Sequence, residues 1–143
     1  MKESEFWALL KRGFSTDPAI HACRVENESG SGMSDVNACR NGVERWIELK
    51  VVHGNWVHFR NSQRSWIVKR TAAGGVVWIL VRDGDAIFIC PGSAVMRDEA
   101  CIEHVDDKSF KIHKDGILRT RSWFKLFPWQ DIISTVFGHW GVT

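Results

Sequence analysis

Two extended segments joined by Asn41-Gly42 place the tightest constraint on the fold of this chain. Residues 36–40 and 43–52 carry strand-forming side chains, and Asn-Gly is a strong signal for a two-residue hairpin turn. In the second segment apolar residues alternate with Glu48 and Lys50, which must therefore share one face of the strand. We predict a hairpin that packs one face on a core and presents an acid beside an amine on the other.

The rest of the chain favours a single mixed α/β domain. Its 143 residues are 44% hydrophobic and 25% charged, which suits one globular core. Helices are predicted over residues 3–12, ended by Gly13, and 62–73, capped by Asn61 or Ser62; further strands are predicted over 19–25, 76–81 and 86–90. The order helix, three strands, helix, two strands predicts a central mixed sheet flanked by helices, with the second helix crossing over to strand 76–81.

Two regions give weaker patterns. Residues 53–60 are expected to form an irregular connection. Residues 93–143 are expected to form a C-terminal extension packed on the same domain as residues 1–92. Within it we predict a strand and turn at 108–118 and a helix over 128–137 with Pro128 in its first turn.

Charge and cysteine content limit the partners, metal sites and cellular location that can be expected. With 19 basic and 17 acidic residues the formal charge is only +2, so contact with nucleic acid would depend on the local basic clusters at 60–70 and 108–125. Solvated faces are the alternative for both clusters. The four cysteines form no CxxC pair, which argues against structural zinc and predicts free, buried thiols. The charged N-terminus and the lack of a long apolar run predict a soluble, cytoplasmic protein without membrane contact.

The acids of the hairpin suit metal-assisted hydrolysis. Magnesium prefers carboxylate and carbonyl oxygens, so Asp35, Glu48 and the main-chain carbonyl of Leu49 are candidate metal ligands. An amine next to such a metal can orient a water, which is the role open to Lys50. Asp followed thirteen residues later by Glu-x-Lys is also compatible with a solvated strand face.

Four motifs in order resemble the PD-(D/E)XK nuclease superfamily, in particular its VRR-NUC and Holliday-junction-resolvase-like group, over residues 1 to about 92. They are the acidic start of the first helix at 3–7, the glycine loop and acid at 30–35, Trp-Ile-Glu-Leu-Lys at 46–50, and Asn-Ser-Gln at 61–63 before Ala-Ala-Gly-Gly at 72–75. The chain departs from the family at Ser34, where proline is usual before the acid.

The resemblance implies roles for two further residues. A first-helix glutamate would support the metal through water. Glu3 and Glu5 both match, and Glu3 is preferred because it lies on the helical stripe of Phe6 and Leu10. The alternative is that these acids only stabilise the helix dipole. Gln63 resembles the glutamine near the scissile phosphate, and its alternative is a helix-start residue with its amide in water.

The resemblance also implies a partner and an activity. It predicts a Mg²⁺-dependent DNA endonuclease, with Mn²⁺ as substitute, acting on branched or nicked DNA such as a Holliday junction or flap. A homodimer in phage or prokaryotic DNA recombination, repair or processing is expected. Alternatives are a catalytically silent nucleic-acid-binding module and a sequence-specific restriction-type enzyme.

Several residues outside the hairpin are candidates for contact with DNA. These are Arg24, Ser31, Arg60 and Arg64. Arg24 and Ser31 flank or lie in the glycine loop, and polar strand-end and ordinary-loop roles remain open for them. Trp56 is the best candidate for stacking on an unpaired base, because most other tryptophans fall in predicted core elements. His53 and His58 are expected at the surface or facing DNA.

Overall fold

The structure is a computed structural model that describes residues 1–25, 31–96, 101–125 and 128–138. Gly30 of the expected glycine loop lies outside these ranges. The helices and strands are α1 (Glu3–Phe14), β1 (Ile20–Arg24), β2 (Val36–Arg40), β3 (Val43–Val51), β4 (Trp56–Arg60), α2 (Asn61–Ala72), β5 (Val77–Asp83), β6 (Ala86–Pro91), η1 (Gly92–Met96), β7 (Ile102–His104), β8 (Ser109–His113), α3 (Lys114–Ile117), η3 (Leu118–Thr120), β9 (Ser122–Lys125) and α4 (Trp129–Phe137).

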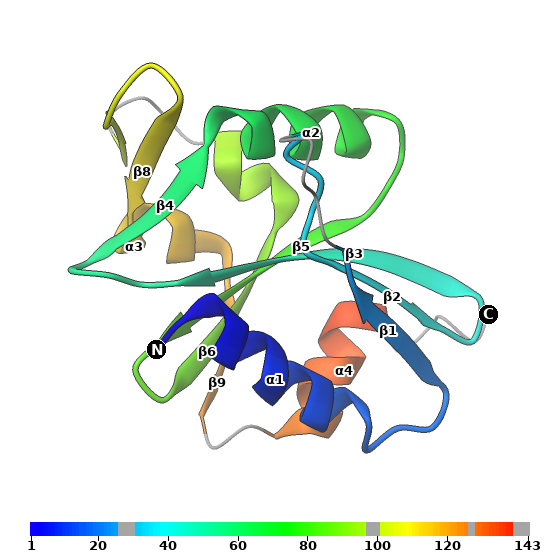
Figure 1. Ribbon diagram of the computed structural model, residues 1–143. Helices are drawn as coiled ribbons and strands as arrows, with labels where there is room; N and C mark the ends of the chain where they lie inside the picture. Colours follow the sequence, from blue (N-terminus) through cyan, green and yellow to red (C-terminus); the bar gives the residue numbers. More distant parts are fainter. Residues whose placement is uncertain (26–30, 97–100, 126–127, 139–143) are drawn as a thin grey trace.

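A six-stranded mixed sheet with the order β1-β2-β3-β5-β6-β9 forms the centre of the molecule (Figure 1). Strands β3 and β5 are parallel and every other neighbouring pair is antiparallel. The chain leaves β3, passes through β4 and α2, and returns as β5, which is the predicted crossover. The expected mixed sheet flanked by helices is confirmed, and β9 shows that residues beyond 92 also contribute a strand to it.

The predicted hairpin is present and its register explains the turn. β2 and β3 pair from Val36 opposite Ile47 to Arg40 opposite Val43. Asn41 and Gly42 both have positive φ, 51° and 81°, as a two-residue turn between twisted strands requires. β3 is longer than β2, so the residues of β3 after Ile47 have no partner in β2.

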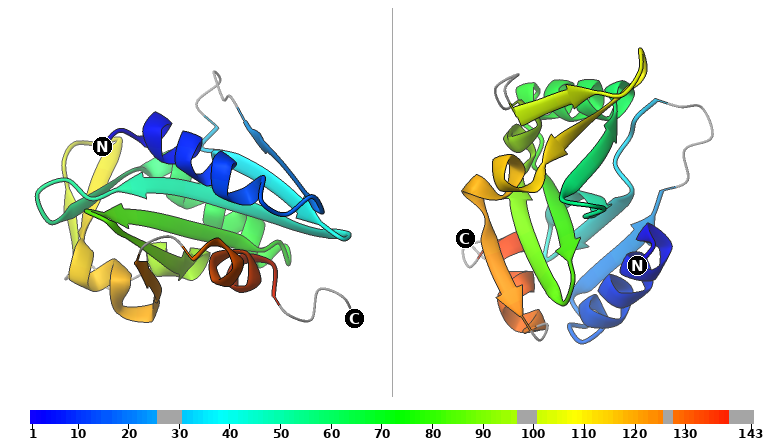
Figure 2. Two further views of the ribbon diagram at one scale, coloured as in Figure 1. Left: turned by 90° about the horizontal axis from the view of Figure 1, so that it is seen from below. Right: turned by 90° about the vertical axis from the view of Figure 1, so that its left-hand side faces the viewer.

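Each face of the sheet has its own apolar core. On one face α1 and α4 cover Ile47, Leu49 and Val51 of β3 together with residues of β5 and β6. On the other face α2, η1 and a smaller sheet cover Ile79, Val81 and Cys90, among others. Figure 2 shows these layers from two further directions. Both faces of β3 are therefore covered by protein, unlike the half-exposed strand expected from its alternation.

The smaller sheet has the order β4-β8-β7, and it corrects the expectation that residues 53–60 are irregular. Val57 and Phe59 point into the core, while Trp56, His58 and Arg60, which alternate with them, point outward. Phe59 stacks on Phe110 of β8, with ring centroids 5.5 Å apart. The alternation is only five residues long, and its pairing partner lies about fifty residues later, so a local pattern was too short to reveal it.

Smaller differences concern caps and connections. α2 has Arg60 at its N-cap rather than Asn61 or Ser62. α3 follows β8 where a turn was expected, and β7 and β9 were not predicted. All four cysteines are free, yet only Cys90 is buried, and Cys23 on the edge strand β1 is exposed. Within the described part of the chain, none of the helices has the length and apolar character needed to cross a membrane.

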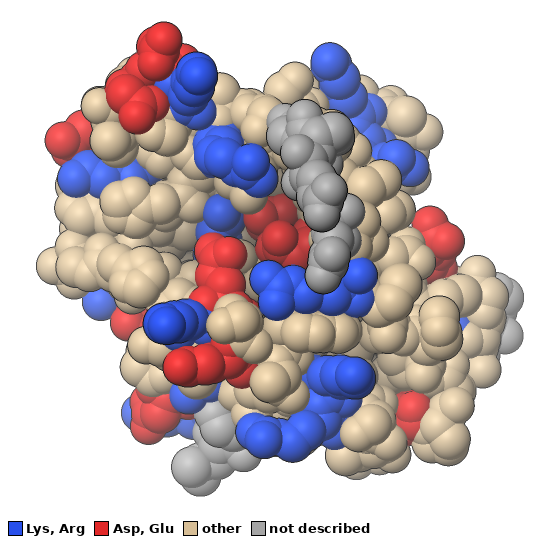
Figure 3. All heavy atoms as spheres, in the orientation of Figure 1, with Lys and Arg blue, Asp and Glu red and all other residues tan. Residues whose placement is uncertain are grey.

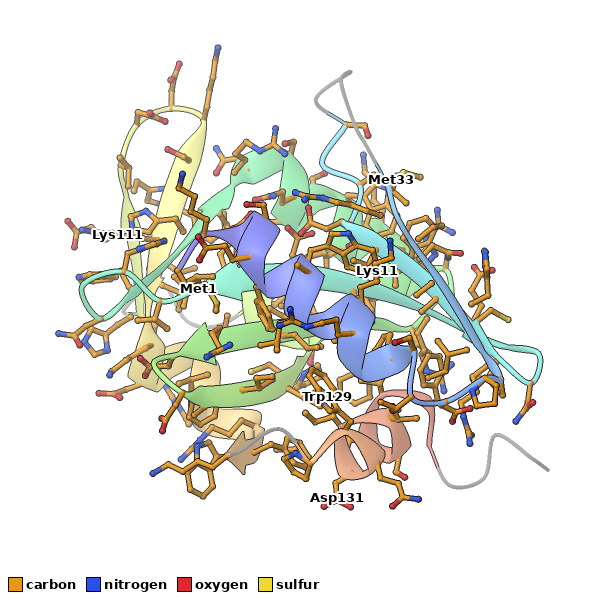
Figure 4. The ribbon with its side chains drawn as sticks, turned by 60° about the horizontal axis from the view of Figure 1, so that its bottom comes forward. Met1, Lys11, Met33, Lys111, Trp129 and Asp131 are labelled. Atoms are coloured by element: carbon orange, nitrogen blue, oxygen red, sulfur yellow. The ribbon has the colours of Figure 1, made fainter. Side chains whose placement is uncertain are left out.

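Gly13 does not end the first helix as predicted, because α1 continues to Phe14. A Cβ atom added at Gly13 would overlap the indole ring of Trp129, the first residue of α4. Figure 4 shows Trp129 at the start of α4, next to α1. Gly13 thus allows the two helices on this face of the sheet to approach closely.

Gly13→Ala is expected to destabilise the protein, although alanine at an open helical site stabilises by about 0.5–1 kcal/mol. The overlap with Trp129 costs about 1–3 kcal/mol, as in other overpacked cores. Urea unfolding of the two proteins measures the sign of the difference. In a Trp129→Ala background the same substitution should become stabilising. A stabilising effect in the otherwise unchanged chain would contradict the close helix contact.

Candidate functional site

The candidate site lies along the edge of β3 that β2 leaves uncovered. β2 begins at Val36, which pairs with Ile47 of β3, and Asp35 immediately precedes it. Asp35 Oδ2 accepts a hydrogen bond of 2.9 Å from the main-chain N–H of Leu49, in place of a further bond from β2. The N–H and carbonyl of one strand residue point to the same side, so the Leu49 carbonyl also faces this edge. Its role as a metal ligand stays a prediction.

Glu48 is completely buried, with 0% of its surface exposed. Its Oε1 accepts a hydrogen bond of 3.0 Å from Gln63 Nε2. Its Oε2 has no hydrogen-bond partner among the described residues. Burial raises the pKa of Glu48 well above its ordinary value, and the nearby charge of Asp35 raises it further. The alternative of a solvated strand face is therefore wrong for this acid.

Lys50 is also buried, and its ammonium group contacts Gln63, Glu48 and the Phe59 ring. Its Nζ donates a hydrogen bond of 3.1 Å to Gln63 Oε1 and lies 3.7 Å from Glu48 Oε1. The ammonium group is also 4.6 Å from the centroid of the Phe59 ring, which supports it from β4. These contacts hold the ammonium beside the carboxylate instead of letting it reach solvent.

Gln63 connects the two strand residues to the start of α2. Besides its bonds to Glu48 and Lys50, its Oε1 accepts a 2.8 Å hydrogen bond from the main-chain N–H of Arg60, the N-cap of the helix. Gln63 is only 7% exposed and its amide bonds to protein groups, so the alternative of a helix-start residue with its amide in water is wrong. Contact of Gln63 with a phosphate stays a prediction.

The first helix brings Glu3, and not Glu5, to the site. Glu3 Oε1 is 4.0 Å from Lys50 Nζ. Burial raises the pKa of Glu3, while the charge of Lys50 opposes that shift. Glu5 instead accepts a 3.2 Å hydrogen bond from the main-chain N–H of Lys2 and so caps its own helix. The spacing to Phe6 and Leu10 had favoured Glu3, and the structure places it accordingly.

The loop before Asp35 makes a contact that sequence reasoning missed. Gly32 has a φ of +76°, and a Cβ atom there would overlap the main chain of Ser62 at the start of α2. Ser34, which stands where the resembling family usually has proline, is completely buried. Only the Gly-Ser-Gly composition hinted at such a close approach. The loop thereby fixes Asp35 relative to the helix that carries Gln63.

The four candidate DNA contacts occupy different places. Arg24 lies close enough to Glu3 for its charge to oppose the rise that burial causes in the pKa of that acid. Ser31 is exposed next to Gly32, and Arg60 is exposed at the N-cap of α2. Arg64 lies over the Phe110 ring and lines a groove along α2 instead of joining the acids. In Figure 3 acidic side chains gather near the centre of one face, with Lys and Arg side chains around them.

The donor set fits a divalent cation. Among the described residues no three His, Cys, Asp or Glu side chains are close enough to form a metal cluster by themselves. Asp35 nevertheless lies close enough to Glu48 for its charge to add to the rise that burial causes in the pKa of Glu48. The unpartnered Glu48 Oε2 leaves a buried acceptor available. Two carboxylates and the Leu49 carbonyl form the oxygen-rich set that Mg²⁺ prefers, completed by water.

Comparison with known proteins identifies the fold. No protein-family model and no curated protein matches the sequence. Among solved structures, the chain is similar to a Holliday junction resolvase, Hjc, from the archaeal hyperthermophile Archaeoglobus fulgidus. The TM-score is 0.54 at 16% sequence identity, and the match covers 83% of this chain and 90% of the resolvase chain. This likeness confirms the expected restriction-endonuclease-like fold.

Glu48→Gln is expected to raise the melting temperature in EDTA at pH 7 by several degrees. The amide keeps the shape and the bond to Gln63 but removes a buried charge that the site disfavours on balance, even with Lys50 3.7 Å away. Because folding raises the pKa of Glu48, its ionisation destabilises the folded state as pH rises above the ordinary glutamate value. The advantage of the variant should thus be absent at low pH and grow toward pH 7.

Mg²⁺ provides the control for this prediction. It should raise the melting temperature of the unchanged protein and shift the Glu48→Gln variant much less, because binding stabilises only a folded state that holds the ion. Equal shifts in both proteins would contradict a cation site at Glu48. Lower stability of the variant in EDTA would contradict the cost assigned to the buried charge.

Proposed function

We propose that this chain is a Mg²⁺-dependent endodeoxyribonuclease that hydrolyses phosphodiester bonds in branched DNA. The observation that carries the proposal is the buried Glu48 carboxylate, held beside Asp35 on one side and Lys50 on the other. Burying the Glu48 carboxylate next to the partly buried Asp35 destabilises the fold unless enough positive charge balances both acids. The presence of both acids at an open strand edge is therefore best accounted for by metal-assisted chemistry.

Each residue of the site has a distinct proposed role. A bound Mg²⁺, for which Mn²⁺ substitutes, supplies polarisation of a phosphoryl oxygen and a water of lowered pKa. Asp35, Glu48 and the Leu49 carbonyl hold the ion, and Glu3 supports it through water. Lys50 orients the nucleophilic water. Gln63 positions Lys50 and Glu48 through its two hydrogen bonds and approaches the phosphate.

A binding-only module is the main alternative. Such a protein gains nothing from acids beside the DNA backbone, because they repel phosphates when no metal is bound. The cations around the acids, with Arg24 close to Glu3, suit a backbone that passes over the site while one phosphate reaches the centre.

The fold and the local charge support a choice of substrate class. The resolvase of similar structure acts on Holliday junctions, as its name states. A small net charge of +2 with local basic patches suits recognition of DNA shape more than sequence. If the substrate is a Holliday junction, we propose a homodimer, since symmetric cuts in two of its strands need two sites. The setting we propose is phage or prokaryotic DNA recombination, repair or processing in the cytoplasm, that of the host if the protein is phage-encoded.

Asp35→Ala and Lys50→Ala should each lower cleavage of branched DNA in Mg²⁺ by about 10²-fold or more, because each removes a direct participant in hydrolysis. Gel-based nicking assays with end-labelled strands measure the rates. Glu3→Gln should reduce cleavage less strongly. Glu5→Gln is the matched control: it alters an acid of the same helical turn that caps α1, and should cleave as the unchanged protein does.

Two results would contradict the proposal. Binding of DNA without cleavage in Mg²⁺ or Mn²⁺ would favour the binding-only module. Equal losses for Glu3→Gln and Glu5→Gln would mean that the helix start, and not the carboxylate at the site, matters for activity.

Branched substrates should be cut at least about tenfold faster than a linear duplex of the same sequence. The expectation follows from recognition by shape through local cationic patches. A panel of four-way junction, flap, nicked and linear duplexes, each in two unrelated sequences, measures the preference. Cutting of linear duplex at one sequence, with indifference to branching, would support the restriction-type alternative.

A further inference from the structure

The outward face of the small sheet carries a group of aromatic and basic side chains that the proposed active site does not use. Alternation along β4 points Trp56, His58 and Arg60 away from the buried Val57 and Phe59. Their partners on β8 are His113, Lys111 and Ser109, respectively. These six residues are called here the outer face of the small sheet.

Trp56 lies at the centre of the contacts on this face. Its ring meets the His113 ring edge-on, with centroids 5.2 Å apart. Lys111 Nζ lies 4.4 Å from the centroid of the Trp56 ring. His113 Nδ1 accepts the main-chain N–H of Asp115, which fixes the histidine ring beside the tryptophan. The indole is therefore held in place before any partner binds.

The outer face continues directly into the candidate site. Arg60 lies at the N-cap of α2, where its main-chain N–H bonds to Gln63. His58 lies within electrostatic range of both Lys50 and His53, and His53 in turn of Glu3. Alternate residues of a strand are about 7 Å apart, so Arg60, His58 and Trp56 form a row that leads about 13 Å away from the site.

The charge of this face favours bases over duplex backbone. Glu103 of β7 lies 3.8 Å from Lys111 Nζ and offsets part of its charge. A surface that follows a duplex relies on many uncompensated cations. An aromatic ring with one or two cations beside it is instead the arrangement that binds unpaired bases by stacking, with the cations on the adjoining phosphates.

We propose that the outer face of the small sheet binds an unpaired DNA strand next to the cleavage site, with one base stacked on Trp56. Lys111 and Arg60 contact the phosphates on either side of the stacked base. This inference rests on the proposed nuclease function and specifies its substrate: a branch that carries a single-stranded arm, such as a flap, rather than a fully paired four-way junction.

Trp56→Leu tests the proposal in a binding assay without catalysis. Fluorescence anisotropy in EDTA compares a labelled oligothymidylate, a flap with a single-stranded arm, and a fully paired four-way junction. Loss of stacking should weaken binding of the first two by about fivefold to a hundredfold and leave the junction unchanged. Trp56→Phe, which keeps an aromatic ring, should retain most of the affinity.

Three further variants separate the effects of stacking, folding and charge. Trp123→Leu removes a tryptophan that is 51% exposed on β9 of the other sheet, and should leave all three affinities unchanged. His58→Ala alters an exposed side chain of the outer face without touching the core, and should weaken flap binding selectively. Lys111→Gln should reduce the dependence of log affinity on log salt by about 1.

The outcomes distinguish this proposal from the nuclease proposal. Equal flap affinity for Trp56→Leu and the unchanged protein, or an equal loss on all three substrates, would overturn the outer face as a single-strand site. Selective loss on the flap supports it, even if no divalent ion yields cleavage. If the Trp56→Leu and His58→Ala variants cleave flaps as fast as the unchanged protein, the nuclease proposal holds and the single-strand site is overturned.

Discussion

The hydrogen bond from the Leu49 N–H to Asp35 determines how the rest of the site is arranged. β2 begins at Val36, one residue after Asp35, and β3 runs on past the partner of Val36, Ile47, without pairing to β2. Unpaired main-chain donors that are removed from water need a partner. Asp35 accepts a hydrogen bond from one of these donors, the Leu49 N–H, and its carboxylate thereby lies next to Glu48. A paired β2 at this point would complete the sheet and leave no room for the acids to meet.

The second constraint is the burial of charge on the face of β3 that carries Glu48 and Lys50. Lys50 offsets part of the cost of burying Glu48, and Gln63 provides both with a hydrogen bond. Glu48 Oε2 still lacks a partner among the described residues, and Asp35 adds a second negative charge. Of Glu48, Asp35 and Lys50, two are negative and one is positive, so about one negative charge is left without a balancing cation. This arrangement costs stability, as is common where residues are placed for function.

Local patterns predicted much of this arrangement. Asn41-Gly42 and the alternation around Glu48 predicted the hairpin, and helical spacing to Phe6 favoured Glu3 over Glu5. The patterns failed where distant segments decide the structure. Gly13 resembled a helix stop, yet the helix continues past it, and a side chain at this position would overlap the ring of Trp129. β4 was missed because its partner lies at 109–113. The burial of Gln63 could not be predicted from a helix start, since it depends on two strand residues and on the close approach of Gly32.

The stacked pair of Phe59 and Phe110 has a consequence for the order of assembly. Lys50 rests on Phe59, and Phe59 is supported by a ring that the chain supplies only at residue 110. A nascent chain that has emerged through residue 92 contains every acid of the site and its lysine but not the strand that holds β4 in place. During synthesis, the residues of the site are therefore present well before the surface that orients them. The protein would acquire its proposed activity only after β8 (Ser109–His113) has been synthesised.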